Sequence, residues 1–169
     1  MDVTTEVDRV LETNREFART FASRDVPPQP RRHLLFVLCM DARIDPLRTL
    51  GLDTGDAHII RNAGGRVADA LRSIAISQSM LGTEAVLIIH HTKCGMAAPS
   101  DEVVHSAIRK TTGAWIPEIP LLTFRDLRAS VQDDLRTYRA CSYVRQDIMV
   151  RGFVYDVDSG LLSEVESAA

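Results

Sequence analysis

The sequence predicts an α/β fold with a mostly parallel central sheet, flanked by helices and completed by an antiparallel C-terminal edge strand. Short apolar runs alternate along the chain with longer segments of helical periodicity. Such alternation is typical of parallel strands joined by right-handed helical crossovers. The last apolar run leads into a turn rich in Asp, Ser and Gly and then a short closing segment, which indicates a hairpin. We therefore expect four parallel strands and one antiparallel strand.

The first segment, residues 1–25, is expected to form an N-terminal helix. From Thr4 to about Ser23, apolar residues recur at helical spacing with charged residues between them. The proline-rich stretch at residues 26–32 ends any helix and forms a short, stiff linker. Because this helix is amphipathic and the linker separates it from the rest of the chain, we expect it to lie apart from the main body or on a partner subunit.

The middle of the chain supplies three strands and the helices between them. Each strand candidate is short and apolar, as expected of central strands that are covered on both faces. The helix candidates begin with Asp-Pro or follow the 3.6-residue period up to a terminating glycine. The predicted strands cover residues 33–38, 57–61 and 85–90, and the predicted helices cover residues 45–50 and 67–81.

The remaining elements alternate in the same way. Helical periodicity is weaker at residues 101–111 and returns clearly at residues 125–139, with an irregular, proline-containing loop at residues 113–120 between them. The chain then becomes β again, with a strand at residues 148–155 and a closing edge strand at residues 161–165.

Size and composition indicate a single domain, residues 1–169, able to bury a substantial core. Hydrophobic residues make up 45% of the chain and charged residues 25%, both close to globular averages. A net charge of -3 and a pI near 5.9 give no broad attraction to nucleic acid or to anionic membranes. No apolar run approaches the roughly 18 residues of a membrane span. Neither nucleic acid nor a membrane is therefore an expected partner.

Three cysteines are too few for a secreted disulfide scaffold and cannot all pair. They fit a reducing compartment, in which thiolates remain free for metal binding or catalysis. The segment Met1–Thr5 has no basic stretch followed by an apolar one, so we expect no signal peptide. We expect the protein to be cytoplasmic.

Two predicted strand ends carry residues that suit a metal ion. Cys39, Asp41 and Arg43 alternate where the first apolar run becomes polar, and His91 and Cys94 follow the third run. Ligands of open parallel sheets collect at the carboxyl ends of the strands, so these two segments should meet. Thiolate and imidazole are zinc ligands, and a catalytic zinc site keeps one position open for water. We predict one Zn(II) on Cys39, His91 and Cys94, with an exchangeable fourth ligand.

Two other residues near these strand ends or of the same chemistry are His90 and Cys141. His90 is a rival to His91, although neighbouring strand residues project to opposite faces and the three-residue spacing to Cys94 favours His91. Cys141 has no histidine or cysteine near it in the sequence and is expected to be an inert thiol.

The same segment offers a group to act on a metal-bound water. Two thiolates cancel the formal charge of Zn(II), so a nearby hydrogen-bond acceptor would help to form and aim hydroxide. Asp41 lies two residues from a ligand, and Arg43 could hold its carboxylate in a forked, ionised pair. This arrangement indicates a hydratase or hydrolase that attacks a small electrophile with zinc-bound hydroxide. The alternative is a non-catalytic zinc protein whose site Asp41 closes as the fourth ligand. A mixed hypothesis is that Asp41 binds the zinc at low pH and returns to Arg43 at higher pH.

The pattern Cys39-x-Asp41-x-Arg43, followed by His91-x-x-Cys94-Gly95, resembles the signature of the β-class carbonic anhydrases. The segment Arg61–Gly64 and the Leu81-Gly82 pair resemble the family's pattern as well, whereas His90 and Lys93 depart from it.

This resemblance implies zinc on the three predicted ligands with the Asp41–Arg43 pair beside it. It also implies a homodimer or homotetramer whose active cleft lies at the subunit interface. The implied reaction is hydration of carbon dioxide to bicarbonate. Because some members share the key residues but prefer carbonyl sulfide or carbon disulfide, hydrolysis of one of those linear molecules is the alternative.

Overall fold

The computed structural model describes residues 2–22, 25–97, 100–116 and 118–166. Five strands form one sheet: β1 (Leu34–Cys39), β2 (Ala57–Asn62), β3 (Ala85–His91), β4 (Met149–Tyr155) and β5 (Leu162–Val165). The other elements are α1 (Val3–Thr20), α2 (Pro46–Leu50), the 3-10 turn η1 (Ala63–Gly65), α3 (Val67–Met80), α4 (Asp101–Thr112) and α5 (Leu127–Ala140).

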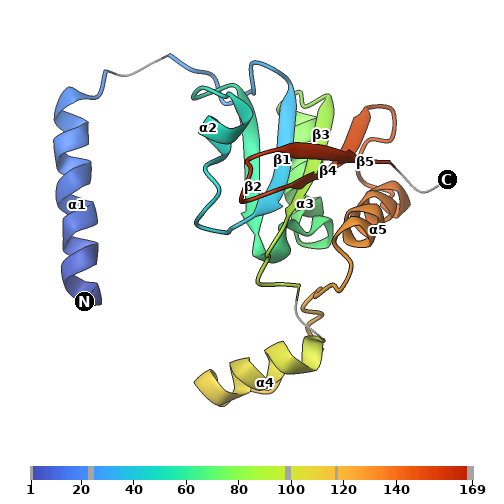
Figure 1. Ribbon diagram of the computed structural model, residues 1–169. Coiled ribbons are helices and arrows are strands. Elements are labelled where there is room, and N and C mark those ends of the chain that lie inside the picture. The colour runs from blue at the N-terminus through green and yellow to red at the C-terminus, as the bar shows by residue number, and fades with distance from the viewer. Residues whose placement is uncertain (1, 23–24, 98–99, 117, 167–169) are drawn as a thin grey trace.

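The strands lie in the order β2-β1-β3-β4-β5 (Figure 1). β1 pairs in parallel with both β2 and β3, β3 pairs in parallel with β4, and β5 is antiparallel to β4. The predicted α/β fold, with four parallel strands and an antiparallel C-terminal edge strand, is confirmed.

The predicted bounds differ from the observed ones at functionally relevant places. Cys39 and His91 are the last residues of β1 and β3, whereas both predicted strands stop one residue earlier. The N-terminal helix begins after Asp2, whose side chain accepts a hydrogen bond from the Thr4 amide, and it ends at Thr20 rather than near residue 25. It ends there because the next residue takes an extended backbone conformation. Residues 1, 23 and 24 of that predicted helix lie outside the described residues.

Both faces of β1 are buried, which explains its unbroken apolar sequence. Leu35 and Val37 face α3 and α5, which lie side by side on one face of the sheet, and pack in a cluster with residues of both helices. Phe36 and Leu38 point to the opposite face and pack in a second cluster that includes Ile44, close to α2. The central strand is therefore held from both sides, and its carboxyl end is well fixed.

Helix α1 stands away from the sheet (Figure 1) and has no buried residue within this chain. It nevertheless carries a row of exposed apolar side chains: Val3, Val7, Val10, Leu11 and Phe17. Among the described residues, no helix combines the length and the apolar character that crossing a bilayer requires. That residues 1–169 form one domain stays a prediction.

Gly65 lets the turn after β2 pack directly against the backbones of β1 and β3. Its φ is +72°, and a Cβ atom there would lie 2.9 Å from the Cys39 amide nitrogen and 3.0 Å from the Ile89 carbonyl oxygen. These neighbours are backbone atoms of β1 and β3, two interior strands of the sheet, and have little room to move. A side chain at this position would therefore push apart the two strands that carry Cys39 and His91.

We predict that Gly65→Ala lowers the free energy of unfolding by about 3 kcal/mol, which combines the left-handed backbone cost with overpacking. Chemical denaturation measures this change. The control is Gly113→Ala: Gly113 has φ +77°, but a Cβ atom there would have no neighbour within 4 Å, so only the backbone cost of about 1 kcal/mol applies. Equal losses in the two variants would contradict the close-packing argument.

Candidate metal centre

Three potential metal ligands converge at the carboxyl ends of β1 and β3. Cys39 ends β1, His91 ends β3, and Cys94 follows in the turn after β3. The two Sγ atoms are 3.9 Å apart, and each of the three residues offers a donor atom within 4.8 Å of the other two. All three side chains are buried. The structure thus brings together the three residues that the sequence predicts as ligands.

The His91 ring is oriented as a metal-binding imidazole would be. Its Nδ1 donates a hydrogen bond of 2.9 Å to the Thr92 carbonyl, which fixes the tautomer with a lone pair on Nε2. That Nε2 is buried and has no hydrogen-bond partner in the described part of the chain. A buried polar atom without a partner is costly, and a metal ion at this point would satisfy it.

The two thiols form a coupled pair. The contact with Cys94 lowers the pKa of Cys39, and the same contact raises the pKa of Cys94. The Met96 amide also donates to Cys94 Sγ at 3.4 Å. Two sulfur atoms and one imidazole nitrogen at this spacing form a donor set that suits zinc, whose binding requires deprotonated thiols.

Asp41 and Arg43 form a forked ion pair beside these donors. Arg43 donates from Nε to Asp41 Oδ1 at 2.9 Å, from Nη2 to Oδ2 at 2.7 Å, and from its amide to Oδ1 at 2.9 Å. The hydrogen bonds from Arg43 hold the pKa of Asp41 well below its usual range, so the carboxylate is ionised at neutral pH. Asp41 Oδ2 lies 3.8 Å from Nε2 of His91.

Arg43 is itself held by the turn that carries the donors. Its Nη2 donates to the Lys93 carbonyl at 2.9 Å. Lys93 has φ +56°, an unusual backbone conformation for a residue other than glycine, and its side chain turns outward to an ion pair with Asp158. Lys93, which departs from the family pattern, therefore contributes a backbone acceptor to the site and places its charge at the surface.

Arg61 also supports the site, although its residue type alone did not mark it as functional in the sequence. Its guanidinium donates to the Cys39 carbonyl at 3.0 Å and to the Asp41 carbonyl at 2.6 Å. It therefore ties β2 to the segment that carries one thiol and the carboxylate. The only sequence signal was its place at the start of the Arg61–Gly64 pattern.

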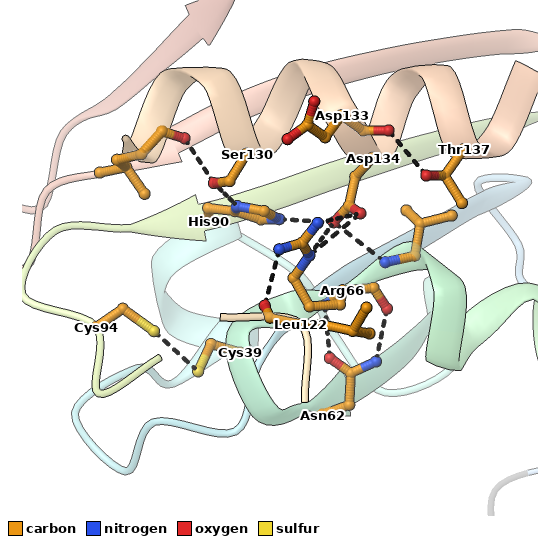
Figure 2. A network of polar contacts seen from close by, with 12 residues as sticks. Cys39, Asn62, Arg66, His90, Cys94, Leu122, Ser130, Asp133, Asp134 and Thr137 are labelled. Carbon is orange, nitrogen blue, oxygen red and sulfur yellow. Dashed lines mark hydrogen bonds and ion pairs between the residues drawn. The ribbon is translucent and has the colours of Figure 1, made fainter. Parts of the chain in front are cut away.

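The remaining candidates lie elsewhere. His90, the predicted rival of His91, points away from the thiols and bonds Asp134 and Ser130 through its two ring nitrogens (Figure 2). Cys141 is buried in the main hydrophobic core and is not part of the three-residue donor group.

A cavity of about 310 Å³ opens beside the donors. Cys39, Asp41 and Cys94 contribute to its wall. The other lining residues are small or apolar: Met40, Ala42, Ala63, Gly64, Gly95 and Met96. Asp41 is the one charged residue among these lining residues of the described chain, and the cavity suits a small, uncharged molecule.

Comparison with known proteins identifies the family. The family model described as carbonic anhydrase matches residues 34–139. A Mycobacterium tuberculosis protein named β-carbonic anhydrase 1 is 41% identical over 165 residues, which cover 95% of this chain and 98% of that protein. A carbon disulfide hydrolase of Acidithiobacillus thiooxidans is 29% identical, covering 90% of this chain and 87% of its own.

A solved structure agrees with these sequence comparisons. The crystal structure of a carbonic anhydrase from Streptococcus mutans superposes with a TM-score of 0.89 at 33% identity, covering 95% of this chain and 97% of that one. The matched segment includes the whole Cys39–Cys94 region in which the donor atoms and the Asp41–Arg43 pair lie. The chain belongs to the β-carbonic anhydrase family.

Proposed function

We propose that the protein binds one Zn(II) per chain through Cys39, His91 and Cys94 and hydrates carbon dioxide to bicarbonate. The observation that carries this proposal is the convergence of these three buried donors beside the ionised Asp41–Arg43 pair. The 41% identity to a mycobacterial protein named β-carbonic anhydrase supports the same reaction.

The proposed ligands fit zinc because His91 Nε2 is buried without a partner and because two thiols lie 3.9 Å apart beside it. When bound, zinc supplies a water molecule that ionises much more readily than bulk water. Each proposed ligand has a supporting contact: the Thr92 carbonyl orients the His91 ring, Arg61 holds the backbone of Cys39, and the Met96 amide donates to Cys94 Sγ. These contacts would orient the three ligands around a bound metal ion.

Asp41 would accept a hydrogen bond from the reacting water. Arg43 uses both carboxylate oxygens of Asp41, but each oxygen can accept more than one hydrogen bond, so Oδ2 can still accept another from the cavity side. Arg43 keeps the carboxylate ionised and fixes its direction. In this role Asp41 orients the water and Arg43 positions Asp41.

The cavity supports a linear, uncharged substrate. Its small and apolar lining residues would accept carbon dioxide without hydrogen bonding, and the charge of Asp41 is neutralised by Arg43. Carbonyl sulfide and carbon disulfide have the same linear shape, and the 29% identity to a carbon disulfide hydrolase keeps their hydrolysis as the alternative function.

The second alternative, a non-catalytic site that Asp41 closes, has less support. To reach a metal, Asp41 would have to give up hydrogen bonds from both the backbone and the side chain of Arg43. Arg43 is in turn anchored on the Lys93 carbonyl. These contacts favour a site whose fourth position stays open.

We also propose a homodimer or homotetramer in a reducing compartment such as the cytoplasm. The apolar row of α1 is unburied within one chain, and a second copy would cover it. Assemblies occur in the fold, since two β-carbonic anhydrases of Sordaria macrospora are described as tetrameric. The thiols of Cys39, Cys94 and Cys141 are free, as they would be in reducing surroundings.

The reaction is tested by stopped-flow hydration of carbon dioxide, alongside hydrolysis of carbonyl sulfide and carbon disulfide, on zinc-loaded protein. We expect carbon dioxide to be the preferred substrate. We expect Asp41→Ala to keep its zinc and to lose turnover by about 100-fold or more, because it removes the acceptor for the reacting water.

Asp147→Ala is the matched control, because Asp147 also forms a forked pair with an arginine two residues away, Arg145, outside the metal centre. This control should keep wild-type turnover. Unchanged turnover in Asp41→Ala would contradict the role of Asp41, and faster turnover of carbon disulfide would favour the alternative substrate.

Cys94→Ser should lose most of its zinc, because an alcohol replaces one of two thiolate ligands. Elemental analysis of the purified protein measures zinc per chain. Cys141→Ser, which alters a buried thiol outside the donor group, should retain wild-type zinc. Equal zinc in the Cys94 and Cys141 variants would argue against the metal site.

The assembly is tested by sedimentation of the full chain, whose monomer mass is 18.8 kDa. We expect a dimer or tetramer, and Val10→Asp should shift the distribution towards smaller species by placing a charge in the apolar row of α1. Thr5→Asp adds the same charge away from that row and should have little effect. A monomeric wild-type protein at micromolar concentration would rule out this assembly.

A further inference from the structure

A buried polar cluster lies behind the metal centre and has no role in the proposed reaction. It consists of Arg66, His90, Ser130 and Asp134, and the exposed fraction of each residue is 7% or less. Figure 2 shows Arg66 and His90 pointing towards the Asp134 carboxylate, which projects from α5. A buried ionic cluster of this kind is costly to desolvate and is weak evidence for stability by itself. The contacts of the cluster indicate a further role for it.

Asp134 accepts hydrogen bonds from two separate parts of the chain, residues 66–67 and His90. Arg66 donates through Nε and Nη2 at 3.1 to 3.2 Å, and the Val67 amide at the start of α3 donates at 3.1 Å. His90 donates from Nε2 at 2.9 Å, and its Nδ1 is 2.7 Å from Ser130 Oγ. One carboxylate on α5 therefore ties together the end of β3 and the beginning of α3.

Arg66 and His90 both also contact the loop before α5. Arg66 Nη1 donates to the Leu122 carbonyl at 2.9 Å, and Leu122 has φ +57°, a costly conformation for a leucine. The Phe124 ring stacks on His90 with 5.6 Å between ring centroids, and the Arg66 guanidinium lies 5.9 Å from the centre of the same ring. The cluster thus fixes the conformation of this loop around Phe124.

Phe124 connects the cluster to the metal centre. It is 8% exposed and packs in one hydrophobic cluster with Cys39 and Cys94. Its amide donates to the Met96 carbonyl at 3.1 Å, just beyond Cys94. The ring therefore borders the two proposed thiolate ligands on one side and the polar cluster on the other.

We propose that Asp134 is a positioning residue of the metal centre: through Arg66 and His90 it holds Phe124 in the cluster with Cys39 and Cys94 and so slows the exchange of bound zinc with solvent. This inference rests on the proposed zinc site but goes beyond it. A purely structural role for the cluster would instead affect stability and leave zinc exchange unchanged.

The test measures the rate at which zinc-loaded protein releases zinc to a coloured chelator, well below the unfolding temperature. In Asp134→Asn, the amide keeps the shape of the carboxylate but presents N–H groups where Arg66 and His90 donate. We expect zinc release about 10 to 100 times faster than in the wild type, the range by which loss of outer partners weakens metal sites. Phe124→Leu keeps the polar cluster and removes only the ring, and should also release zinc about tenfold faster.

Tyr138→Phe is the matched control. Tyr138 lies one turn after Asp134 on α5, is fully buried, and has a hydroxyl group that bonds Gln78 and the Arg145 carbonyl. This variant should lose stability yet release zinc at the wild-type rate. A second readout is the sulfur-to-metal absorption of cobalt-substituted protein, which should change in Asp134→Asn and Phe124→Leu but not in the control.

Wild-type rates of release in both Asp134→Asn and Phe124→Leu would overturn the inference while leaving the proposed function standing. If Asp134→Asn does not fold, Phe124→Leu decides the outcome alone. The inference would also be overturned if the rate of zinc release followed the melting temperature across all variants, including the control. A wild-type protein that takes up no zinc would instead overturn the proposed function, and this inference with it.

Discussion

The parallel pairing of β1 with β3 is the constraint on which the candidate site depends. Because the two strands run side by side in the same direction, their last residues, Cys39 and His91, reach the same edge of the sheet. Gly65 allows this edge to be closely packed, since its missing side chain leaves room for the backbones of both strands. The turn after β3 then brings Cys94 back to within 3.9 Å of Cys39. Parallel pairing of these two strands is therefore enough to bring together donor residues more than fifty positions apart in the sequence.

Charge balance explains why the site has one carboxylate and one guanidinium beside two thiols. Two thiolates would neutralise a divalent cation, so an unpaired carboxylate close by would add excess negative charge. Arg43 balances Asp41 and at the same time fixes its direction through contacts to both oxygens and to the Lys93 carbonyl. The same contacts oppose movement of Asp41 into the ligand position, so the arrangement favours an open coordination site.

The sequence was sufficient to predict the sheet and the convergence of Cys39, His91 and Cys94, because strand ends and donor residues are both visible locally. It also placed Asp41 beside Arg43, since residues two apart lie on the same side of an extended segment. It did not predict that Arg61 binds the backbone of Cys39, or that Asp134 joins Arg66 to His90. Those contacts link residues 22 to 68 positions apart and depend on how the sheet and helices pack, which no local pattern records.

The central claim is that two thiolates and one imidazole hold a single zinc ion and leave one position open to solvent. X-ray absorption at the zinc edge of the purified full chain tests it most directly. We predict two sulfur and two lighter ligands, one of them an imidazole and the other displaced when a small anion such as azide is added. A zinc ion bound by four protein side chains that no anion displaces, or a protein without zinc, would contradict this claim.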